Sequence, residues 1–256
     1  MSVLRSRGNP RVKRWAKLAR DGRLRRRECR ALIEGAHLLE AFLDGGGMPL
    51  ALLVSEPASA EIDSLVKKAG ATPIVVSEPV LRAIADADTP QGVLAEIALP
   101  EVRAPEGADR AFLEGIQDPS NVGAIIRSAA AFGIGEVVLD RSCADPWSPR
   151  ALRAGMGGHF RLAIRQAERL DAELAAFRGT LVCTAPRDGQ SLDAAKLEGP
   201  LGWLLGAEGQ GVSEAAARRA KVRVAIPMAR GMESLNVAAA AAILFYRGFS
   251  RRAAGS

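Results

Sequence analysis

The sequence predicts a two-domain α/β protein: a small N-terminal α/β domain and a larger C-terminal α/β domain built on a parallel sheet. Three observations predict this fold class. Short apolar segments alternate with helix-like segments along most of the chain. The stretch from Pro100 to Gly107, with two prolines and two acids, separates two such series. The 256 residues, of which 48% are hydrophobic and 25% charged, can form a sizeable core and exclude a wholly disordered chain.

In the first series, the pair Asn9-Pro10 begins a helix and the pair Asp21-Gly22 ends it. The triplet Gly45-Gly46-Gly47 predicts a loop. The remaining elements follow from apolar runs between turn residues. Strands are expected at 31–33, 51–54, 73–76 and 92–98, and helices at 36–43, 58–69 and 80–85.

The second series follows the same alternation. Strands are expected at 111–116, 136–139, 160–164, 180–184, 201–205 and 222–226, and helices at 121–132, 149–155, 167–177 and 235–249. Such alternation predicts a parallel sheet with helices on its faces. The expected domains are a basic arm at 1–30, a small α/β domain at 31–99, a linker at 100–107 and the larger domain at 108–256.

Positive charge is concentrated in the arm. Residues 1–30 contain twelve Lys or Arg and two acids, a net charge of +10, whereas the whole chain carries +6. A polyanion is the partner that fits such an arm, because each phosphate that is neutralised releases counterions. A solvated basic helix and a helix lying on a membrane surface are the alternatives.

Composition also narrows the class of protein. The longest apolar run, from Val237 to Phe245, is far shorter than a membrane span, and the N-terminus has no apolar signal region. Three scattered cysteines are typical of a reducing cytoplasm and argue against a disulfide framework. With two histidines, no metal site is expected. Cys143 and Cys183 are interpreted as core residues, His37 as structural and His159 as a weak candidate for RNA contact.

Three segments follow predicted strands, where ligands gather in parallel sheets. The first runs from Asp118 to Arg127 and can place Asn121 and Arg127 partly on one helix face, although a capped helix with a surface arginine has the same pattern. The second, Gly206-Ala207-Glu208-Gly209-Gln210-Gly211, suits a backbone-lined small-molecule pocket or a plain tight turn. It has neither Walker nor dinucleotide-binding spacing.

The third segment runs from Ile226 to Val237 and leads into an alanine-rich helix. Ser234 can act as a helix cap. Asn236 is expected to be buried at the start of that helix, where its amide needs a hydrogen-bonding partner.

Together these segments resemble the signature of the SpoU branch of the SPOUT RNA methyltransferases. The resemblance rests on Asp118-Pro119-x-Asn121-x-Gly123-Ala124-x-x-Arg127, Gly206-x-Glu208-Gly209-x-Gly211, Ile226-Pro227-Met228 and Ser234-Leu235-Asn236-Val237. It extends through 144–149 and 153–157. In the first half, the stretch from Asn9-Pro10 to Ile33-Glu34-Gly35, with Gln91-Gly92-Val93, resembles the RNA substrate-binding domain of members that methylate ribosomal RNA.

The resemblance implies transfer of a methyl group from S-adenosylmethionine to a ribose 2′-hydroxyl of RNA, most simply ribosomal RNA. It also implies a C-terminal trefoil knot and a homodimer that shares its active sites. The implied catalytic residues are Arg127, Asn121, Glu208, Ser234 and Asn236. The implied cofactor-binding residues are Gly206, Ala207, Glu208, Gly211, Ile226, Met228, Ser234, Leu235 and Asn236. The candidate RNA contacts are Arg11, Lys13, Arg14, Arg25, Arg26, Arg27 and Arg153.

Two roles are open for Arg127: the proton acceptor that the family proposal makes it, or an electrostatic stabiliser of the developing alkoxide. The alternative functions are a transfer-RNA 2′-O-methyltransferase of the same branch and a non-catalytic RNA-binding protein. A nucleotide-dependent dehydrogenase is disfavoured, because the dinucleotide fingerprint is missing.

Overall fold

The computed structural model describes residues 3–185, 188–232 and 234–254, so the first two residues of the predicted arm lie outside it. The chain forms two compact units. Unit 1 consists of Met1–Glu101 and Asp145–Phe160, and unit 2 of Val102–Ala144 and Arg161–Ser256. The segment Asp145–Phe160 therefore belongs to unit 1, although the residues on both sides of it belong to unit 2.

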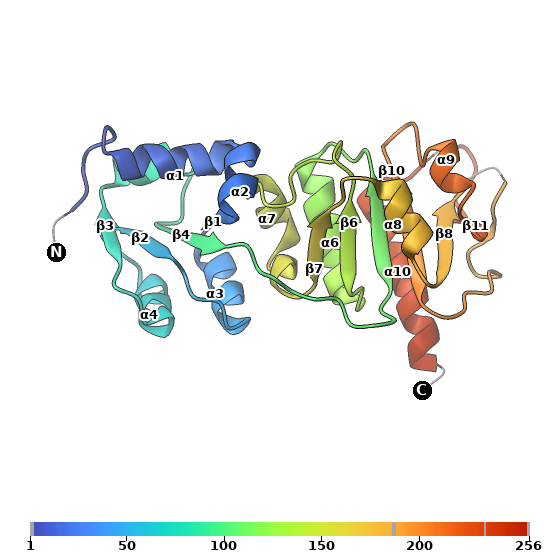
Figure 1. The fold of residues 1–256 in the computed structure, drawn as a ribbon. Helices are drawn as coiled ribbons and strands as arrows, with labels where there is room; N and C mark the ends of the chain where they lie inside the picture. Colours follow the sequence, from blue (N-terminus) through green and yellow to red (C-terminus); the bar gives the residue numbers. More distant parts are fainter. Residues whose placement is uncertain (1–2, 186–187, 233, 255–256) are drawn as a thin grey trace. The chain divides into compact units, whose positions relative to one another are not determined.

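Unit 1 is built on a four-stranded sheet with the order β1-β4-β2-β3 (Figure 1). Strand β4 is antiparallel to both β1 and β2, while β2 and β3 are parallel, so the sheet is mixed. Alternation of strands and helices along a sequence does not reveal this change of direction. Its elements are α1 Pro10–Arg20, α2 Gly22–Glu28, β1 Arg30–Glu34, α3 Ala36–Asp44, β2 Ala51–Ser55, α4 Ala60–Ala69, β3 Ile74–Val76, α5 Glu78–Ile84, β4 Val93–Ala98, α7 Pro149–Gly155 and the 3₁₀ helix Gly158–Phe160.

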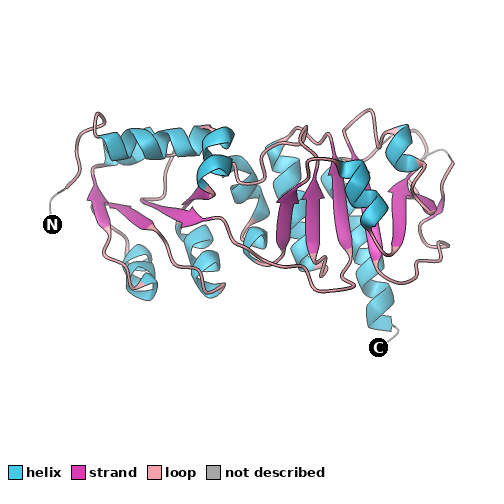
Figure 2. Cartoon of the chain, in the orientation of Figure 1, coloured by secondary structure: helices cyan, strands magenta, loops and turns pink. Residues whose placement is uncertain are grey.

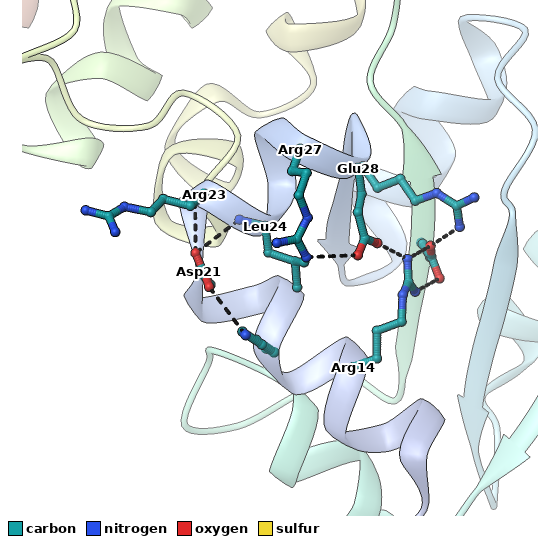
Figure 3. A network of polar contacts seen from close by, with 9 residues as sticks. Arg14, Asp21, Arg23, Leu24, Arg27 and Glu28 are labelled. Atoms are coloured by element: carbon teal, nitrogen blue, oxygen red, sulfur yellow. Dashed lines mark hydrogen bonds and ion pairs between the residues drawn. The ribbon is translucent and has the colours of Figure 1, made fainter.

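The predicted basic arm is a packed part of unit 1. The side chain of Asn9 caps α1, and Pro10 occupies its first turn. Asp21 ends α1 as expected, but its carboxylate also caps α2 by accepting the backbone N–H groups of Arg23 and Leu24 (Figure 3). The apolar stripe of α1 is buried in the unit 1 core; it consists of Val12, Trp15, Leu18 and Ala19. Removing the arm would therefore open the core.

Unit 2 confirms the predicted parallel sheet. Its seven strands have the order β7-β6-β5-β10-β8-β11-β9, and every neighbouring pair is parallel (Figures 1 and 2). Its elements are β5 Arg110–Glu114, α6 Pro119–Ala131, β6 Glu136–Leu139, β7 Ala163–Gln166, α8 Leu170–Ala176, β8 Thr180–Thr184, β9 Gln190–Ser191, β10 Leu201–Gly206, α9 Glu214–Ala217, β11 Val222–Ala225 and α10 Val237–Ala254. The trefoil knot stays a prediction.

Two boundaries differ from the sequence predictions for local reasons. The strand expected at 160–164 begins at Ala163, because Gly158–Phe160 forms a 3₁₀ helix. The last helix begins at Val237, because the side chain of Asn236 accepts the backbone N–H groups of Ala238 and Ala239. Helices α2 and α9 and the short strand β9 were not predicted.

The sheet order positions the three segments of interest. Strands β5 and β10 are neighbours, with Glu114 opposite Gly206, and β8 separates β10 from β11. Because all the strands are parallel, the segments that follow β5, β10 and β11 leave the same edge of the sheet. Trp203 of β10 and Phe245 of α10 pack edge to face in the core between this helix and the sheet.

Among the described residues, none of the helices combines the length and the apolar character needed to cross a membrane.

Candidate functional site

One hydrogen-bonded cluster joins the three segments. Asn121 lies in the first turn of α6, Glu208 in the loop after β10, and Asn236 just before α10. The Asn236 Nδ2 donates to Asn121 Oδ1 at 3.0 Å and to Glu208 Oε1 at 3.2 Å. The Asn121 Nδ2 donates to the same Glu208 oxygen. The structure thus brings together three of the predicted site residues from well-separated parts of the chain.

Asn236 has the hydrogen-bonding role that its sequence position demanded, although it is exposed and not buried as expected. Its Oδ1 caps α10 while its Nδ2 reaches the other two segments. Asn121, by contrast, is 9% exposed. The cap on α10 and the cluster therefore depend on a single side-chain orientation.

The loop from Gly206 to Gly211 is tightly closed. The backbone N–H of Gly211 donates to the carbonyl of Ala207 at 2.8 Å. A Cβ added to Gly206 would lie 2.1 Å from the backbone C and O atoms of Gly211, far inside van der Waals contact. Gly209 and Gly211 have φ values of +84° and +69°, which favour glycine. The glycine pattern is thus explained by the shape of the loop itself.

Two residues that the sequence reasoning missed hold the far end of this loop. Glu114, the last residue of β5, accepts the backbone N–H and the hydroxyl of Ser213, each at 2.7 Å. Ser213 also caps the short helix α9. A carboxylate at the carboxyl end of a buried strand was the available signal for Glu114.

Arg127 is exposed on α6, and its guanidinium forms no hydrogen bond or ion pair with any residue that the structure describes. The cluster oxygen of Glu208 is bound by the two asparagines and not by this arginine. The five donors of the guanidinium therefore remain available to a ligand.

The predicted cofactor-binding residues fit S-adenosylmethionine in their chemistry. A Cβ added at Gly209, Gly211 or Gly231 would meet nothing within 4 Å, so the backbone is open at these points. The side chains of Met228 and Leu235 are 36% and 39% exposed and offer apolar surface, whereas Ile226 is half-buried and Ser234 exposed. The Glu208 carboxylate supplies negative charge, which suits a sulfonium group.

The predicted RNA contacts fall into two groups. Arg11, Lys13, Arg26 and Arg27 are exposed, and Arg27 also lies 3.8 Å from the carboxylate of Glu28. Arg14, Arg25 and Arg153 are less exposed and are held in ion pairs within unit 1. Arg25 is only 4% exposed; its Nε donates to Asp145 at 2.8 Å, and a terminal nitrogen donates to the carbonyls of Leu18 and Ala19. Arg25 is therefore an interior residue of unit 1.

His159 is also an interior residue and does not fit the interpretation as an RNA contact. It is 1% exposed, and its Nε2 lies 2.8 Å from the carbonyl of Pro146. Burial lowers the pKa of His159 to about 4, against the opposing effect of that hydrogen bond. Cys143 and Cys183 are buried as interpreted, and burial raises the pKa of the Cys143 thiol to about 12.

Two family models match the chain. The SpoU rRNA Methylase family matches residues 110–246, which contain all three segments of the cluster. The MRM3-like substrate binding domain matches residues 9–95, which include α1, strands β1, β2 and β3, and the first half of β4.

Individual relatives match over nearly the whole chain. The 23S rRNA (guanosine(2553)-2′-O)-methyltransferase RlmP of Bacillus subtilis is 31% identical over 248 residues, 96% of this chain and 98% of the relative. A crystal structure of an RNA 2′-O ribose methyltransferase has a TM-score of 0.82 at 30% identity, covering 98% of this chain and all of the other. An AdoMet-bound rRNA methyltransferase from Sinorhizobium meliloti has a TM-score of 0.82 at 27% identity and covers 98% of both chains.

Proposed function

This chain belongs to the SpoU rRNA methylase family, and we propose that it transfers a methyl group from S-adenosylmethionine to a ribose 2′-hydroxyl of ribosomal RNA. The observation that carries the proposal is the cluster of Asn121, Glu208 and Asn236, which joins the three family segments. Arg127 lies on the same helix as Asn121 and is exposed. The AdoMet-bound relative supports the choice of methyl donor.

S-Adenosylmethionine, when bound, supplies an electrophilic methyl group, so the chain's own task is to hold donor and ribose in line. The residues that would hold it are Gly206, Ala207, Glu208, Gly211, Ile226, Met228, Ser234, Leu235 and Asn236. Asn121 and Asn236 fix the Glu208 carboxylate, so its charge needs no reorientation when the cationic donor binds.

Arg127 acts on the ribose oxygen. Its guanidinium keeps its proton in almost any protein setting, so it is a poor proton acceptor. It is instead a donor that stabilises negative charge developing on the 2′-oxygen and grips the neighbouring phosphate. A phosphate oxygen of the substrate then accepts the hydroxyl proton. The exposure of Arg127 suits both contacts.

Unit 1 supplies the RNA contacts in this proposal, and the match to a substrate-binding domain supports it. Exposed bases, among them Arg11, Lys13, Arg26 and Arg27, neutralise phosphates. The relative's name favours ribosomal RNA over transfer RNA. The reaction would take place in the cytoplasm, where the three free cysteines remain reduced.

We also propose that the active form is a homodimer. Unit 2 exposes large apolar side chains on α10 and on the segment before it: Met228, Met232, Leu235, Ile243, Tyr246 and Phe249. A second copy covering this surface would remove apolar area from water. It would also bring a second chain to Leu235 and Met228, which belong to the proposed cofactor site.

The test is methyl transfer from isotope-labelled S-adenosylmethionine to ribosomal RNA transcribed without modification, with transfer RNA as the competing substrate. We expect label on ribose at a defined position of ribosomal RNA. Exclusive labelling of transfer RNA would support the alternative methyltransferase. RNA binding without any donor binding by titration calorimetry would instead identify a non-catalytic RNA-binding protein.

A further inference from the structure

A buried carboxylate lies beneath the basic helix of unit 1. Glu96 is in the middle of strand β4 and is 3% exposed, between the apolar residues Ala95 and Ile97. It accepts four hydrogen bonds. Both terminal nitrogens of Arg14 donate at 3.0 Å, Arg30 donates at 2.6 Å, and the indole Nε1 of Trp15 donates at 2.7 Å.

These contacts connect Glu96 of β4 to α1 and β1, and through Arg14 to α2. Arg14 and Trp15 belong to α1, and Arg30 to β1. Arg14 also donates at 2.5 Å to Glu28 of α2, and the two side chains face each other in Figure 3. Burial by itself raises the pKa of Glu96, but the hydrogen bonds from Arg14, Arg30 and Trp15 hold it below its ordinary value. The carboxylate is therefore ionised at neutral pH.

An ion-pair cluster at this place is not needed merely to attach the helix. Val12, Leu18 and Ala19 already bury an apolar stripe against the core. Replacing a buried ion pair by apolar residues is often neutral or stabilising, because removing the charges from water is costly. Directional hydrogen bonds do what an apolar stripe cannot do well: they fix the rotation and the register of the helix on the sheet.

The rotation of α1 decides where its exposed bases point. Lys13, Lys17 and Arg20 are exposed, and at 100° per residue they lie on the side of α1 opposite the buried stripe. Lys17 lies 4.0 Å from Asp21, and Arg20 donates to the carbonyls of Ala16 and Ala83. The direction in which these bases point is therefore set by the same contacts that orient Arg14 and Trp15 on Glu96.

We propose that Glu96 is a positioning residue for RNA binding: it holds α1 at the rotation and register in which its exposed bases match the phosphates of the substrate. This inference rests on the proposed function, and it concerns a residue that touches neither RNA nor the methyl donor.

A competing role for Glu96 predicts the opposite sign. If Glu96 only neutralises Arg14 and Arg30, then Glu96→Gln frees two partly exposed arginines and RNA binding tightens. If Glu96 positions α1, the amide of Gln presents N–H groups to a site filled with donors, the helix shifts, and RNA binding weakens. The direction of the change separates the two roles.

The matched control is Glu136→Gln in unit 2. Glu136 is 7% exposed and likewise binds two arginines, with its oxygens 2.9 Å from Arg110 Nε and 3.1 Å from Arg165 Nε. The variant Glu136→Gln therefore loses a similar buried ion-pair cluster, and this cluster does not contact α1. Circular-dichroism melting of both variants verifies that they are folded and similarly destabilised.

The measurements are affinity for in vitro transcribed ribosomal RNA across a salt series, steady-state methylation, and amide hydrogen exchange. We expect Glu96→Gln to weaken RNA affinity about tenfold and to lower the slope of log affinity against log salt by about one. The KM for RNA should rise with kcat and donor affinity unchanged, and amides of residues 10–20 should exchange faster. Glu136→Gln should show none of these changes.

Tighter RNA binding by Glu96→Gln, or effects equal to those of Glu136→Gln, would overturn the inference. If Glu96→Gln does not fold, Trp15→Phe replaces it, because this variant removes one of the four hydrogen bonds and keeps an apolar ring. Trp15→Phe should change the same quantities in the same direction by a smaller factor. An unchanged KM for RNA in this variant would overturn the inference. A wild-type chain that neither binds nor methylates the RNA contradicts the proposed function instead, whereas unchanged exchange in α1 contradicts the positioning role alone.

Discussion

The two units assemble their functional residues in opposite ways. In unit 2, three side chains come from segments up to 115 residues apart and meet in one cluster. In unit 1, the bases come from one continuous stretch, but the fold separates them: Arg25 forms an interior ion pair and Arg14 pairs with the buried Glu96, while Lys13 and Lys17 stay exposed. In unit 2, residues that are far apart in the sequence therefore meet in space. In unit 1, residues that are adjacent in the sequence have different roles.

The largest expected effect concerns Arg127, the exposed arginine on α6, the helix that also carries Asn121 of the cluster. We expect Arg127→Ala to reduce single-turnover methylation about a thousandfold, because the donor to the developing alkoxide is lost. Affinity for the methyl donor should stay unchanged. Arg127→Lys keeps the charge but not the planar fork, so it should recover only part of the rate. Near-normal methylation by Arg127→Ala would remove this residue from the mechanism.

The next effect tests the separation of bases within unit 1. Arg25→Gln leaves Asp145 without its buried partner and should lower the free energy of unfolding by about 3 kcal/mol. The salt dependence of RNA binding by Arg25→Gln should equal that of the wild type. The double variant Lys13→Gln/Lys17→Gln should do the reverse, lowering the salt slope by about two with little loss of stability. Denaturant titration and binding across a salt series measure the two quantities, and identical behaviour of the variants would contradict the separation.

A smaller effect is expected in the glycine loop of unit 2. In Gly206→Ala the new Cβ would collide with the backbone of Gly211, so the loop that carries Glu208 must move. We expect affinity for S-adenosylmethionine to fall roughly tenfold or more, measured by calorimetry. Gly209→Ala is the control, because its new Cβ meets no atom within 4 Å. The only cost of this substitution is the backbone strain of an alanine at φ +84°, about 1 kcal/mol. Equal losses in both variants would contradict a steric cause.

The smallest effect is a pH dependence in unit 1. The pKa of His159 is lowered to about 4 in the folded chain, so the unfolded chain binds more protons between that value and its ordinary pKa. Stability contributed by the neutral imidazole is therefore present above the unfolded pKa and is lost as pH falls toward 4. Between about pH 7 and about pH 5.5 the loss should be about 1 kcal/mol. His159→Gln should flatten this dependence of stability on pH. If the variant and the wild type show the same slope, His159 is excluded as the source of the dependence.

The fold class followed from local pattern alone. Apolar runs alternating with capped helices placed most elements within a few residues, because caps such as Asn9 and first-turn prolines act on their immediate neighbours. The order of the strands and the antiparallel setting of β4 did not follow, since both depend on pairing between distant segments. Glu96 was missed, although a lone carboxylate inside the apolar strand Val93–Ala98 was a readable signal that it needed buried partners.

For the candidate site, the sequence by itself determined which residues to consider: the glycines of the loop after β10, Asn236 at the start of a helix, and the charge of residues 1–30. Glycine conformations, helix caps and charge are properties that short stretches of chain carry with them. Only the tertiary structure decided that Asn121, Glu208 and Asn236 share hydrogen bonds and that Arg25 lies in the interior. Contacts and burial are set by the packing of elements distant in the chain, which no short stretch encodes.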